Sequence, residues 1–491
     1  MGIIARIWAQ PPERIAVRTG GVEVGYARLT ADVDAAVAAF RKDGLSSGST
    51  IGIRAGPADN GHSYANWVAH LAAIKLGAAH ISMTDKPATK AGLQAGKVDR
   101  VIGNFEPLID VPLSVKRLQF HVDPTGPSPV IEAQPNEEGS ARRLNLTSGT
   151  TGKPKFIAWD AKMIELRTDQ VADGGMVDGE TVLFPLLHLR TTAGFRYPLA
   201  AWAAGGCVVL PTARKGLDRD KEALPACNFI TCSPPQLKER LAGIEGIWPG
   251  KERRTILLLG GRLPAAMAEA ALARACDRLF VSYGATETGS IAIGEHEVIA
   301  RHPGAVGYVR PGVEVEIAAK GGGTAEPGQP GLVRTRTPMM AASYEGASAP
   351  TSDAHFRDGW FYPGDVGRLY EDGLLAIDGR TGDTLNVGGW KVGAVDLEAR
   401  VAELPHVRDV CAVAMQLPDG DILTFGIVCD DGKDLDSIRV GIRDILSRSR
   451  RFNIIRLPGI PRNAMGKIPR ALIASQLAAL YGASKKSAAN A

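Results

Sequence analysis

The sequence is poor in cysteine, and its cysteines form no recognisable motif. The 491 residues include six cysteines, none in a CxxC pair and none grouped with histidines in a ligand-like pattern. This distribution argues against a disulfide framework and against a structural zinc site. A reducing cytoplasm fits it best.

Long apolar runs are also absent. No uninterrupted apolar stretch approaches the roughly 20 residues that a bilayer-spanning helix needs. Residues Met1 to Gln10 lack the basic and then apolar pattern of a signal peptide. We therefore expect a soluble, cytoplasmic protein without a membrane span.

The charge is nearly balanced, because 57 Lys and Arg residues face 53 Asp and Glu residues, for a formal net charge of +4. An excess this small does not predict nucleic-acid binding. With 45% hydrophobic and 22% charged residues, the chain has globular composition and room for more than one domain. A late basic cluster is typical of a solvated helix face, and it comprises Arg439, Arg443, Arg448, Arg450, Arg451 and Arg456.

Neither of two common nucleotide-binding fingerprints is present. The loop of nucleotide triphosphatases places four residues between Gly and Gly-Lys, with Ser or Thr after the Lys. Here two residues separate Gly149 from Gly152, and Pro154 follows Lys153. The glycine pattern of dinucleotide-binding folds is not matched either.

The ten residues from Leu146 to Lys155 nevertheless have the composition of a polyphosphate-binding loop. They contain four hydroxyls, two glycines and two lysines. Glycines let successive backbone N–H groups turn inward, hydroxyls add donors, and ammonium groups offset phosphate charge. A solvated Ser/Thr/Gly turn is the alternative interpretation, and the density of donors favours phosphate.

The order of elements predicts an α/β fold. A strand is expected at residues 50–54 and a helix at 64–76, and this alternation is typical of a largely parallel sheet. Further strands are expected at 207–210, 229–232, 255–259 and 279–282. Ligand sites in such sheets lie beyond the carboxyl ends of the strands.

The last third of the chain has a different texture. Short β-like runs at 313–317, 331–336 and 374–377 alternate with Gly- and Pro-rich turns, which predicts a small antiparallel, barrel-like lobe. Beyond residue 380 about 110 residues remain, enough for a compact α+β domain. Its helices are expected at residues 398–404 and 437–449, and its strands at 410–414 and 424–428.

Five segments, in this order, resemble the signature motifs of adenylate-forming enzymes. This superfamily includes acyl- and aryl-CoA synthetases, nonribosomal adenylation domains and beetle luciferases, and the motifs are most similar to those of the acyl- and aryl-CoA ligases. The segments are Leu146 to Lys155, Ser282 to Gly289, Tyr362 to Gly367, Gly379-Arg380 with Asn386 to Lys391, and Pro461 to Ile468. The resemblance covers nearly the whole chain.

The resemblance implies an α/β fold class with two domains. Residues 1–379 would form a large N-terminal domain of stacked, mostly parallel sheets with a small β-barrel-like lobe, which binds AMP and the acyl group. Residues 380–491 would form a small, mobile α+β domain that carries the catalytic lysine.

The resemblance also implies a two-step reaction. A carboxylate attacks the α-phosphorus of ATP, pyrophosphate leaves, and a thiol then attacks the acyl-adenylate. Transfers of this kind depend on positioning and charge stabilisation. ATP, Mg²⁺ and coenzyme A are the expected cofactors, and a small carboxylic acid is the expected substrate.

By resemblance, the nucleotide is held by the loop and by the second motif. Tyr283 and Gly284 would contact adenine, Thr286 the α-phosphate, and Glu287 the magnesium ion, which takes one or two carboxylates beside the phosphates. A surface carboxylate is the alternative for Glu287. The residues expected around the β- and γ-phosphates are Thr147, Ser148, Gly149, Thr150, Thr151, Gly152, Lys153 and Lys155.

Three further positions match nucleotide contacts of the family. Asp365 would accept both ribose hydroxyls, with an Asx-turn as the alternative role. Arg380 would pair with ribose or α-phosphate oxygens through its planar fork. The backbone of Gly260, Gly261 and Arg262 would line the adenine pocket.

Lys467 matches the lysine that the family's mobile domain brings to the carboxylate and the α-phosphate. For the second step the family turns this domain about a hinge, here Gly382, where relatives usually have Asp or Lys. Glycine can adopt both backbone states. The thiol tunnel that then replaces Lys467 would be formed by Gly388, Gly389, Trp390 and Lys391.

The acyl group should lack an α-amine. Amino-acid-activating relatives place an aspartate in the segment that matches Phe184 to Arg190, and this segment contains none. His188 instead matches the histidine of acyl- and aryl-CoA ligases, with a structural role as the alternative. The other acyl-binding residues, expected from position only, are Phe195, Phe229, Ser233, Pro234 and Ser290.

The predicted function is that of an AMP-forming acid:thiol ligase, with coenzyme A as the favoured thiol. The alternative is a stand-alone adenylating enzyme that loads a carrier protein, which would meet the late basic cluster. A non-catalytic nucleotide sensor is a remote alternative, against which Lys467, Glu287 and Asp365 argue. The sequence does not separate fatty, branched and aryl acids.

Overall fold

The computed structural model describes most of the chain, and its contacts divide it into two compact units. Unit 1 comprises Met1–Val315, Arg334–Tyr362 and Asp372–Leu375, and unit 2 comprises Glu316–Val333, Pro363–Glu371 and Ala376–Ala491. The predicted boundary at residue 380 stays a prediction. The described residues are 1–54, 62–83, 97–103, 116–147, 155–210, 217–319, 321–345, 352–381, 384–387, 390–417, 420–430, 435–446, 451–462 and 468–489.

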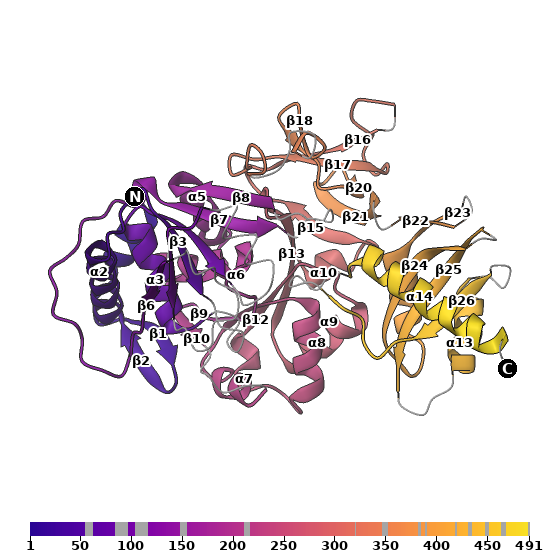
Figure 1. The fold of residues 1–491 in the computed structure, drawn as a ribbon, viewed down its shortest axis with the longest axis horizontal. Coiled ribbons are helices and arrows are strands. Elements are labelled where there is room, and N and C mark those ends of the chain that lie inside the picture. The colour runs from indigo at the N-terminus through magenta and orange to yellow at the C-terminus, as the bar shows by residue number, and fades with distance from the viewer. Residues whose placement is uncertain are drawn as a thin grey trace. The chain divides into compact units, whose positions relative to one another are not determined.

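Unit 1 contains a sheet with a parallel centre (Figure 1). Its strands, in spatial order, are β15 (Ala305–Val309), β14 (Gly289–Glu295), β13 (Arg278–Ala285), β12 (Thr255–Leu259), β11 (Phe229–Cys232), β9 (Val182–Pro185), β10 (Cys207–Leu210), β1 (Ile15–Thr19) and β2 (Val22–Gly25). The strands from β13 to β1 pair in parallel, and β14, β15 and β2 are antiparallel to their neighbours. The central strands are short apolar runs that are almost entirely buried, as parallel strands covered on both faces require.

A second sheet of unit 1 contains the two strands that flank the predicted phosphate loop. Its strands, in spatial order, are β6 (Lys116–Gln119), β5 (Arg100–Gly103), β3 (Thr50–Arg54), β4 (Ala79–Met83), β7 (Arg142–Thr147) and β8 (Lys155–Asp160). All neighbours pair in parallel except β7 and β8, which are antiparallel. Parallel pairing in both sheets confirms the predicted α/β fold class.

Helices connect and cover these strands, and polar residues begin several of them. The helices of unit 1 are α1 (Ile3–Trp8), α2 (Tyr26–Lys42), α3 (Tyr64–Lys75), α5 (Ala161–Ala172), α6 (Thr192–Ala203), α7 (Leu217–Ala223), α8 (Pro234–Gly243), α9 (Ala265–Arg274) and α10 (His296–Ile299). The side chains of Ser63, Asp160 and Thr191 cap α3, α5 and α6 by accepting a backbone N–H of the first turn. None of the helices in the described ranges is long and apolar enough to span a bilayer.

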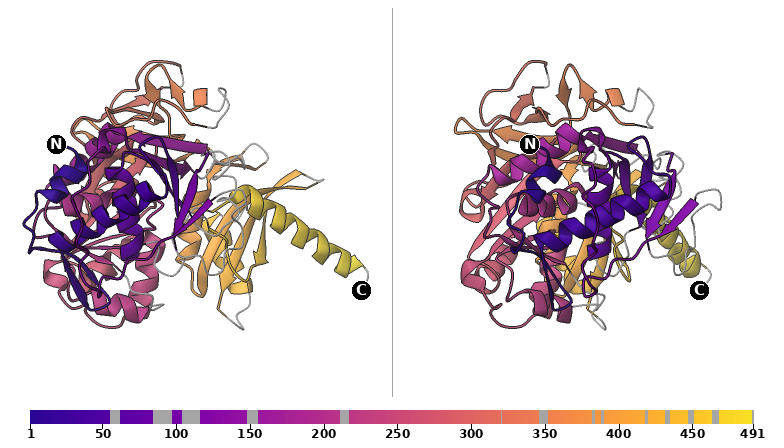
Figure 2. Two further views of the ribbon diagram at one scale, coloured as in Figure 1. Left: turned by 60° about the vertical axis from the view of Figure 1, so that its left-hand side comes forward. Right: turned by 90° about the vertical axis from the view of Figure 1, so that its left-hand side faces the viewer.

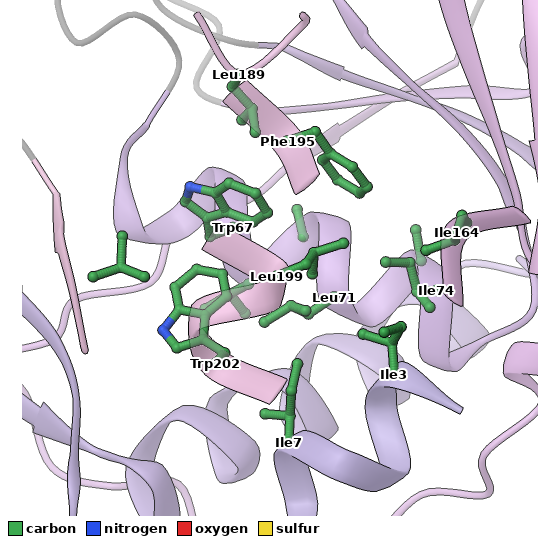
Figure 3. Packing of buried hydrophobic residues seen from close by; sticks show 14 of the residues in the cluster. Ile3, Ile7, Trp67, Leu71, Ile74, Ile164, Leu189, Phe195, Leu199 and Trp202 are labelled. Atoms are coloured by element: carbon green, nitrogen blue, oxygen red, sulfur yellow. The ribbon is translucent and has the colours of Figure 1, made fainter. Parts of the chain in front are cut away.

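The largest core cluster of unit 1 draws side chains from both sheets and from the helices between them. In Figure 3, α3 and α6 face each other across this cluster, and α1 lies beside them. The labelled side chains of these three helices are Trp67, Leu71, Ile74, Phe195, Leu199, Trp202, Ile3 and Ile7. Because this cluster is apolar and fully buried, it fixes the position of α6, which follows the predicted acyl-binding segment.

Between residues 314 and 380 the strands are short, as the sequence predicts. They are β16 (Glu314–Ala318), β17 (Gly331–Arg336), β18 (Phe356–Arg357), β19 (Trp360–Phe361), β20 (Asp365–Leu369) and β21 (Leu374–Arg380). The pairs β17/β19, β17/β20 and β18/β19 are antiparallel.

Unit 2 has an α+β core in which helices cover both faces of one sheet. Its remaining elements are β22 (Thr384–Val387), β23 (Trp390–Gly393), α12 (Ala394–Ala402), β24 (Val407–Leu417), β25 (Gly420–Cys429), α13 (Leu435–Ile445), β26 (Phe452–Arg456) and α14 (Arg470–Ala489). On β24, Val410 and Ala412 pack with α12 and α13, whereas Cys411 and Val413 pack with α14. Alternation with period two produces these two apolar faces. Figure 2 shows the last turns of α14 extending past the sheet.

Stability should fall as the pH is lowered from about 6.5 to about 4. Trp67 Nε1 donates to His62 Nδ1 at 3.2 Å, and His62 Nε2 lies 2.5 Å from Leu187 O, so both ring nitrogens of the buried neutral imidazole are engaged. Burial lowers the pKa of His62 to about 4. The unfolded chain, with a histidine pKa of about 6.5, binds more protons in this window, so protonation favours unfolding.

Burial also lowers the pKa values of His70 and His80, and these histidines act in the same direction. We expect the urea midpoint to be constant between pH 7 and pH 8 and to decrease steadily below pH 6.5. Equal midpoints at pH 7 and pH 5 would contradict the buried, neutral state of these side chains.

Candidate functional site

Four neighbouring strands of unit 1 end at one edge of the sheet, and a predicted site segment follows or ends each of them. The strands β9, β11, β12 and β13 pair in parallel, so their carboxyl ends lie together. His188 comes after β9, Ser233 and Pro234 after β11, Gly260 to Arg262 after β12, and Thr286 with Glu287 after β13. Residues far apart in the sequence are therefore gathered at this edge.

The second motif forms a β-hairpin. Tyr283, Gly284 and Ala285 belong to β13, and Ala285 pairs with Gly289 at the start of β14. The sequence predicts that the strand ends at residue 282, and this is wrong because antiparallel pairing with β14 extends it. A Cβ on Gly284 would lie 2.1 Å from Gly289 O, which is main chain, so only glycine fits there. Thr286 and Glu287 consequently lie in the tight turn of the hairpin.

Glu287 is held by three hydrogen bonds. Its side chain is 9% exposed, and Oε1 accepts a hydrogen bond from Tyr344 Oη at 2.7 Å. Its carbonyl oxygen accepts from Arg167 Nη2 and from Ala341 N, each at 2.9 Å. The sequence does not predict these partners of the carboxylate and the turn.

The donor set around Glu287 fits a magnesium ion that arrives with a nucleotide. Within the described part of the chain, no three His, Cys, Asp or Glu side chains form a group that could hold a metal by themselves. Magnesium usually keeps several waters and binds one or two carboxylates together with substrate phosphates. A single fixed carboxylate in a turn at the sheet edge meets that requirement.

His188 lies in a short turn between β9 and α6. Its Nδ1 accepts a hydrogen bond from Arg190 N at 3.2 Å, and its carbonyl oxygen accepts from Thr191 N and Thr191 Oγ1, each at 2.8 Å. A Cβ on Gly194 would lie 2.2 Å from His188 O, so the first turn of α6 approaches this carbonyl closely. The main chain and one ring nitrogen of His188 are thus fixed.

The other predicted acyl-binding residues differ in accessibility. Phe195 is fully buried in the core, stacked on Trp67 at 5.5 Å. Phe229 is 3% exposed, and Ser290, at 1%, has its Oγ 2.8 Å from Ser282 Oγ. Pro234 is buried, whereas Ser233 is partly exposed at the start of α8. Their acyl-binding roles stay predictions.

The predicted adenine-binding residues lie at the carboxyl ends of β12 and β13, and their exposure differs. Gly260, Gly261 and Arg262 are exposed, and Gly260 has φ of +85°, a conformation that glycine adopts without strain. Tyr283 is partly exposed. An exposed glycine turn next to a partly exposed aromatic ring is consistent with a surface that receives a planar base.

In unit 2, Asp365 and Arg380 form an ion pair. Arg380 Nε donates to Asp365 Oδ1 at 2.7 Å, and the side chains are 40% and 3% exposed, respectively. Thr381 donates from N and from Oγ1 to Gly364 O, at 2.9 and 3.0 Å. The two residues predicted to bind ribose and phosphate are therefore adjacent, and their ligand roles stay predictions.

Several predicted site residues lie outside the described residues. They are Ser148, Gly149, Thr150, Thr151, Gly152, Lys153, Gly382, Gly388, Gly389 and Lys467. Thr147 and Lys155, at the two ends of the predicted phosphate loop, are paired with each other across β7 and β8. The backbone of Trp390 and Lys391 belongs to β23 in the β22–β23 hairpin. The roles of all these residues stay predictions.

Comparison with protein families finds a match in the N-terminal two thirds of the chain. A family model described as "AMP-binding enzyme" matches residues 4–345.

Curated relatives include ligases that act on different acids. A fatty acid–[acyl-carrier-protein] ligase from Mycobacterium marinum is 26% identical, over 94% of this chain and 95% of that protein. An indoleacetate–CoA ligase from Aromatoleum aromaticum is 28% identical, over 66% of this chain and 64% of that protein. A malonate–CoA ligase from Xenopus laevis is 27% identical, over 66% of this chain and 63% of that protein. The chain thus spans less than two thirds of the length of several curated relatives.

Solved structures share the fold over almost the whole chain. An ATP-bound RpMatB–BxBclM chimera has a TM-score of 0.82 at 19% identity, covering 98% of this chain and 99% of that one. An o-succinylbenzoate CoA synthetase from Bacillus subtilis has a TM-score of 0.81 at 20% identity, covering 96% and 97%. At such identities the likeness establishes the fold alone, and it confirms the predicted fold class.

Proposed function

Because the chain belongs to the family of AMP-binding enzymes, we propose that it activates a carboxylic acid with ATP and passes the acyl group to a thiol. Membership of this family confirms the resemblance to adenylate-forming enzymes. In the proposed reaction, a carboxylate oxygen attacks the α-phosphorus, pyrophosphate leaves, and the thiol sulfur replaces AMP on the acyl carbon.

The convergence of site segments at one sheet edge carries this proposal. Tyr283 and the exposed Gly260 turn would receive adenine, and Thr286 in the hairpin turn would donate to the α-phosphate. Glu287 would bind the magnesium ion, which supplies positive charge for the departing pyrophosphate. Fixed donors and charges of this kind stabilise the transition state because they need no reorganisation during the reaction.

The acid proposed as substrate lacks an α-amino group. The segment from Phe184 to Arg190 offers His188 and no carboxylate for an ammonium group. Relatives named for indoleacetate and malonate act on acids without an α-amine, which supports the same class.

Coenzyme A is the proposed thiol, and a carrier protein is the second candidate. The relatives named as CoA ligases support the first. The second is supported by the Mycobacterium marinum protein, which acts on an acyl-carrier protein and aligns over 94% of this chain. The late basic cluster would offer complementary charge to an acidic carrier, and Arg439 and Arg443 of this cluster lie on α13.

A thiol competition decides between the two candidates. The purified chain is incubated with ATP, Mg²⁺ and an accepted acid, and equal concentrations of coenzyme A and a phosphopantetheinylated carrier protein are added together. Mass spectrometry of both thiols gives the initial rates. We expect the acyl group mainly on coenzyme A. Acyl transfer to the carrier alone would show that the carrier protein, and not coenzyme A, is the thiol substrate. Transfer to neither thiol would contradict the proposed ligase function.

Glu287→Gln should weaken the response to magnesium. The amide keeps the shape of the side chain but lacks the charge that a hard cation prefers. We expect the Mg²⁺ concentration for half-maximal pyrophosphate release to rise at least about tenfold, with partial recovery at high Mg²⁺. The matched control is Glu295→Gln, since Glu295 pairs with Arg278 on the surface of the same hairpin. A Glu287→Gln variant with the wild-type magnesium response would remove Glu287 from the metal site.

A further inference from the structure

Tyr344 connects the carboxylate of Glu287 to a strand next to the predicted phosphate loop. Its hydroxyl donates to Glu287 Oε1 at 2.7 Å, although the two residues are 57 positions apart. The neighbouring Glu345 exchanges two main-chain hydrogen bonds with Phe156 of β8, at 2.9 and 3.1 Å. The strand β8 begins at Lys155, where the predicted loop ends.

The ring of Tyr344 is itself fixed. It is 8% exposed and makes edge contacts with His355 and Phe356, with ring centroids 5.9 and 5.2 Å apart. Its backbone N donates to Ser352 Oγ at 3.2 Å. A fixed ring holds the hydroxyl oxygen in one place, so its hydrogen bond restricts the orientation of the carboxylate that accepts it.

Arg167 holds the main chain of the same turn. It is fully buried on α5 and donates to Thr286 O, Glu287 O and Met339 O, at 2.8, 2.9 and 2.8 Å. Its guanidinium lies 4.3 Å from the ring centre of Trp159. A planar fork that satisfies three carbonyl oxygens at once is a rigid clamp, which a lysine cannot reproduce.

Arg167 is fully buried, and a guanidinium stays charged in proteins. Burying this cation costs desolvation free energy. Its described hydrogen bonds all go to carbonyl oxygens. These bonds offset part of that cost, and the turn that they hold carries Thr286 and Glu287. The clamp therefore acts where the proposed reaction needs fixed groups.

We propose that Tyr344 and Arg167 are positioning residues for magnesium binding by Glu287. Tyr344 engages Oε1 and directs Oε2 toward the ion, while Arg167 prevents the turn from shifting as the ion and the phosphates bind. The inference rests on the proposed function, in which Glu287 is the metal carboxylate. Residues that orient metal ligands typically change metal affinity 10- to 100-fold when they are replaced.

Tyr344→Phe provides the main test, because it removes one hydroxyl and keeps the ring. Titration calorimetry with ATP at a series of Mg²⁺ concentrations, without any acid, measures binding in the absence of turnover. We expect a 10- to 100-fold higher Mg²⁺ concentration for half-maximal enhancement of ATP binding. ATP binding in EDTA should equal that of the wild type. An unchanged magnesium response would overturn the role of Tyr344.

Tyr64→Phe is the matched control. Tyr64 of α3 is 4% exposed, and its hydroxyl donates at 2.6 Å to Oδ2 of the buried Asp32 of α2. This variant loses the same kind of hydrogen bond, so its stability should fall as that of Tyr344→Phe does. Its magnesium response should stay that of the wild type, and an equal shift in both variants would show a general effect of stability.

Arg167→Lys and Arg254→Lys form the second matched pair. Arg254 is also fully buried, and it donates to Ala275 O at 2.9 Å, Leu224 O at 2.5 Å and Pro249 O. Both variants should lose stability, but only Arg167→Lys should need more Mg²⁺. Equal magnesium responses would reduce Arg167 to a structural residue. If Arg167→Lys does not fold, Tyr344→Phe decides the proposal.

Glu287→Gln is measured in the same titrations, so that two failures can be told apart. If Glu287→Gln binds magnesium and ATP like the wild type, the metal site of the proposed function is wrong. If Glu287→Gln is impaired and Tyr344→Phe is not, the proposed function stands and the positioning role is overturned.

Discussion

Lys467→Ala should lower the rate of acyl-adenylate formation by about 10²- to 10³-fold, which corresponds to about 3–4 kcal/mol of transition-state stabilisation. By its resemblance to the family, this lysine meets the charge that develops on the carboxylate and the α-phosphate. Thioester formation from a chemically prepared acyl-adenylate should largely survive, because the proposed thiol tunnel uses Gly388 to Lys391 instead. Pyrophosphate exchange and thioester yield, measured on one preparation, give the two rates.

Lys162→Ala is the control for this substitution. Lys162 lies on α5, is 68% exposed and pairs with Glu165, so both half-reactions should keep their wild-type rates. Equal losses in both half-reactions of Lys467→Ala, or no loss in either, would contradict the proposed division of labour between Lys467 and the thiol tunnel.

Trp202→Ala should reduce the free energy of unfolding by about 3–5 kcal/mol, the range for truncation of a large buried aromatic side chain. Trp202 is fully buried on α6 and meets Trp67 edge to face at 4.9 Å between ring centres (Figure 3). Its Nε1 also donates to Ala16 O of β1 at 2.8 Å. The substitution therefore leaves a cavity and removes the hydrogen bond to Ala16 O.

Urea unfolding followed by far-ultraviolet circular dichroism measures this loss. Trp202→Phe should cost less, since it keeps a ring and loses only the hydrogen bond and part of the volume. Val130→Ala, at a fully exposed position, should change the free energy of unfolding by no more than about 0.5 kcal/mol. A loss below about 1 kcal/mol for Trp202→Ala would mean that this core is not packed as described.

Sequence patterns predict the strands that are buried and apolar. The strands at 207–210, 229–232 and 255–259 are found with these bounds, because each is a short apolar run between polar or glycine-containing segments. The hydrophobic pattern fails where a buried strand contains charged residues. Arg143, for example, belongs to β7 and is fully buried there. Its guanidinium lies 3.6 Å from the ring centre of Phe195, a contact that no local pattern indicates.

Helix bounds in unit 2 show the same limitation. The helix expected at 398–404 begins at Ala394 and ends at Ala402. The shift arises because β23 ends at Gly393, which serves as the N-cap, and tertiary pairing of that hairpin decides where the helix can start. Local propensity alone does not contain this information.

For the site, the sequence predicts residues in contiguous motifs and misses those that act through the fold. Glu287 is predicted because it belongs to a recognisable string, whereas Tyr344 and Arg167, which contact it, lie 57 and 120 positions away. Arg167 is an ordinary charged residue on a helix, and Tyr344 is a single aromatic in a Gly- and Ala-rich stretch. Only the three-dimensional contacts reveal that both converge on one turn.

Product analysis with a panel of acids tests the central claim most directly. The purified chain is incubated with ATP, Mg²⁺ and fatty, branched or aryl acids without an α-amine, and the nucleotides are resolved by chromatography. We predict that at least one acid yields AMP and pyrophosphate in equal amounts when a thiol acceptor is added, and acyl-adenylate together with pyrophosphate when the thiol is omitted. ATP binding without acid-dependent AMP for any acid, or the formation of ADP and phosphate, would contradict it.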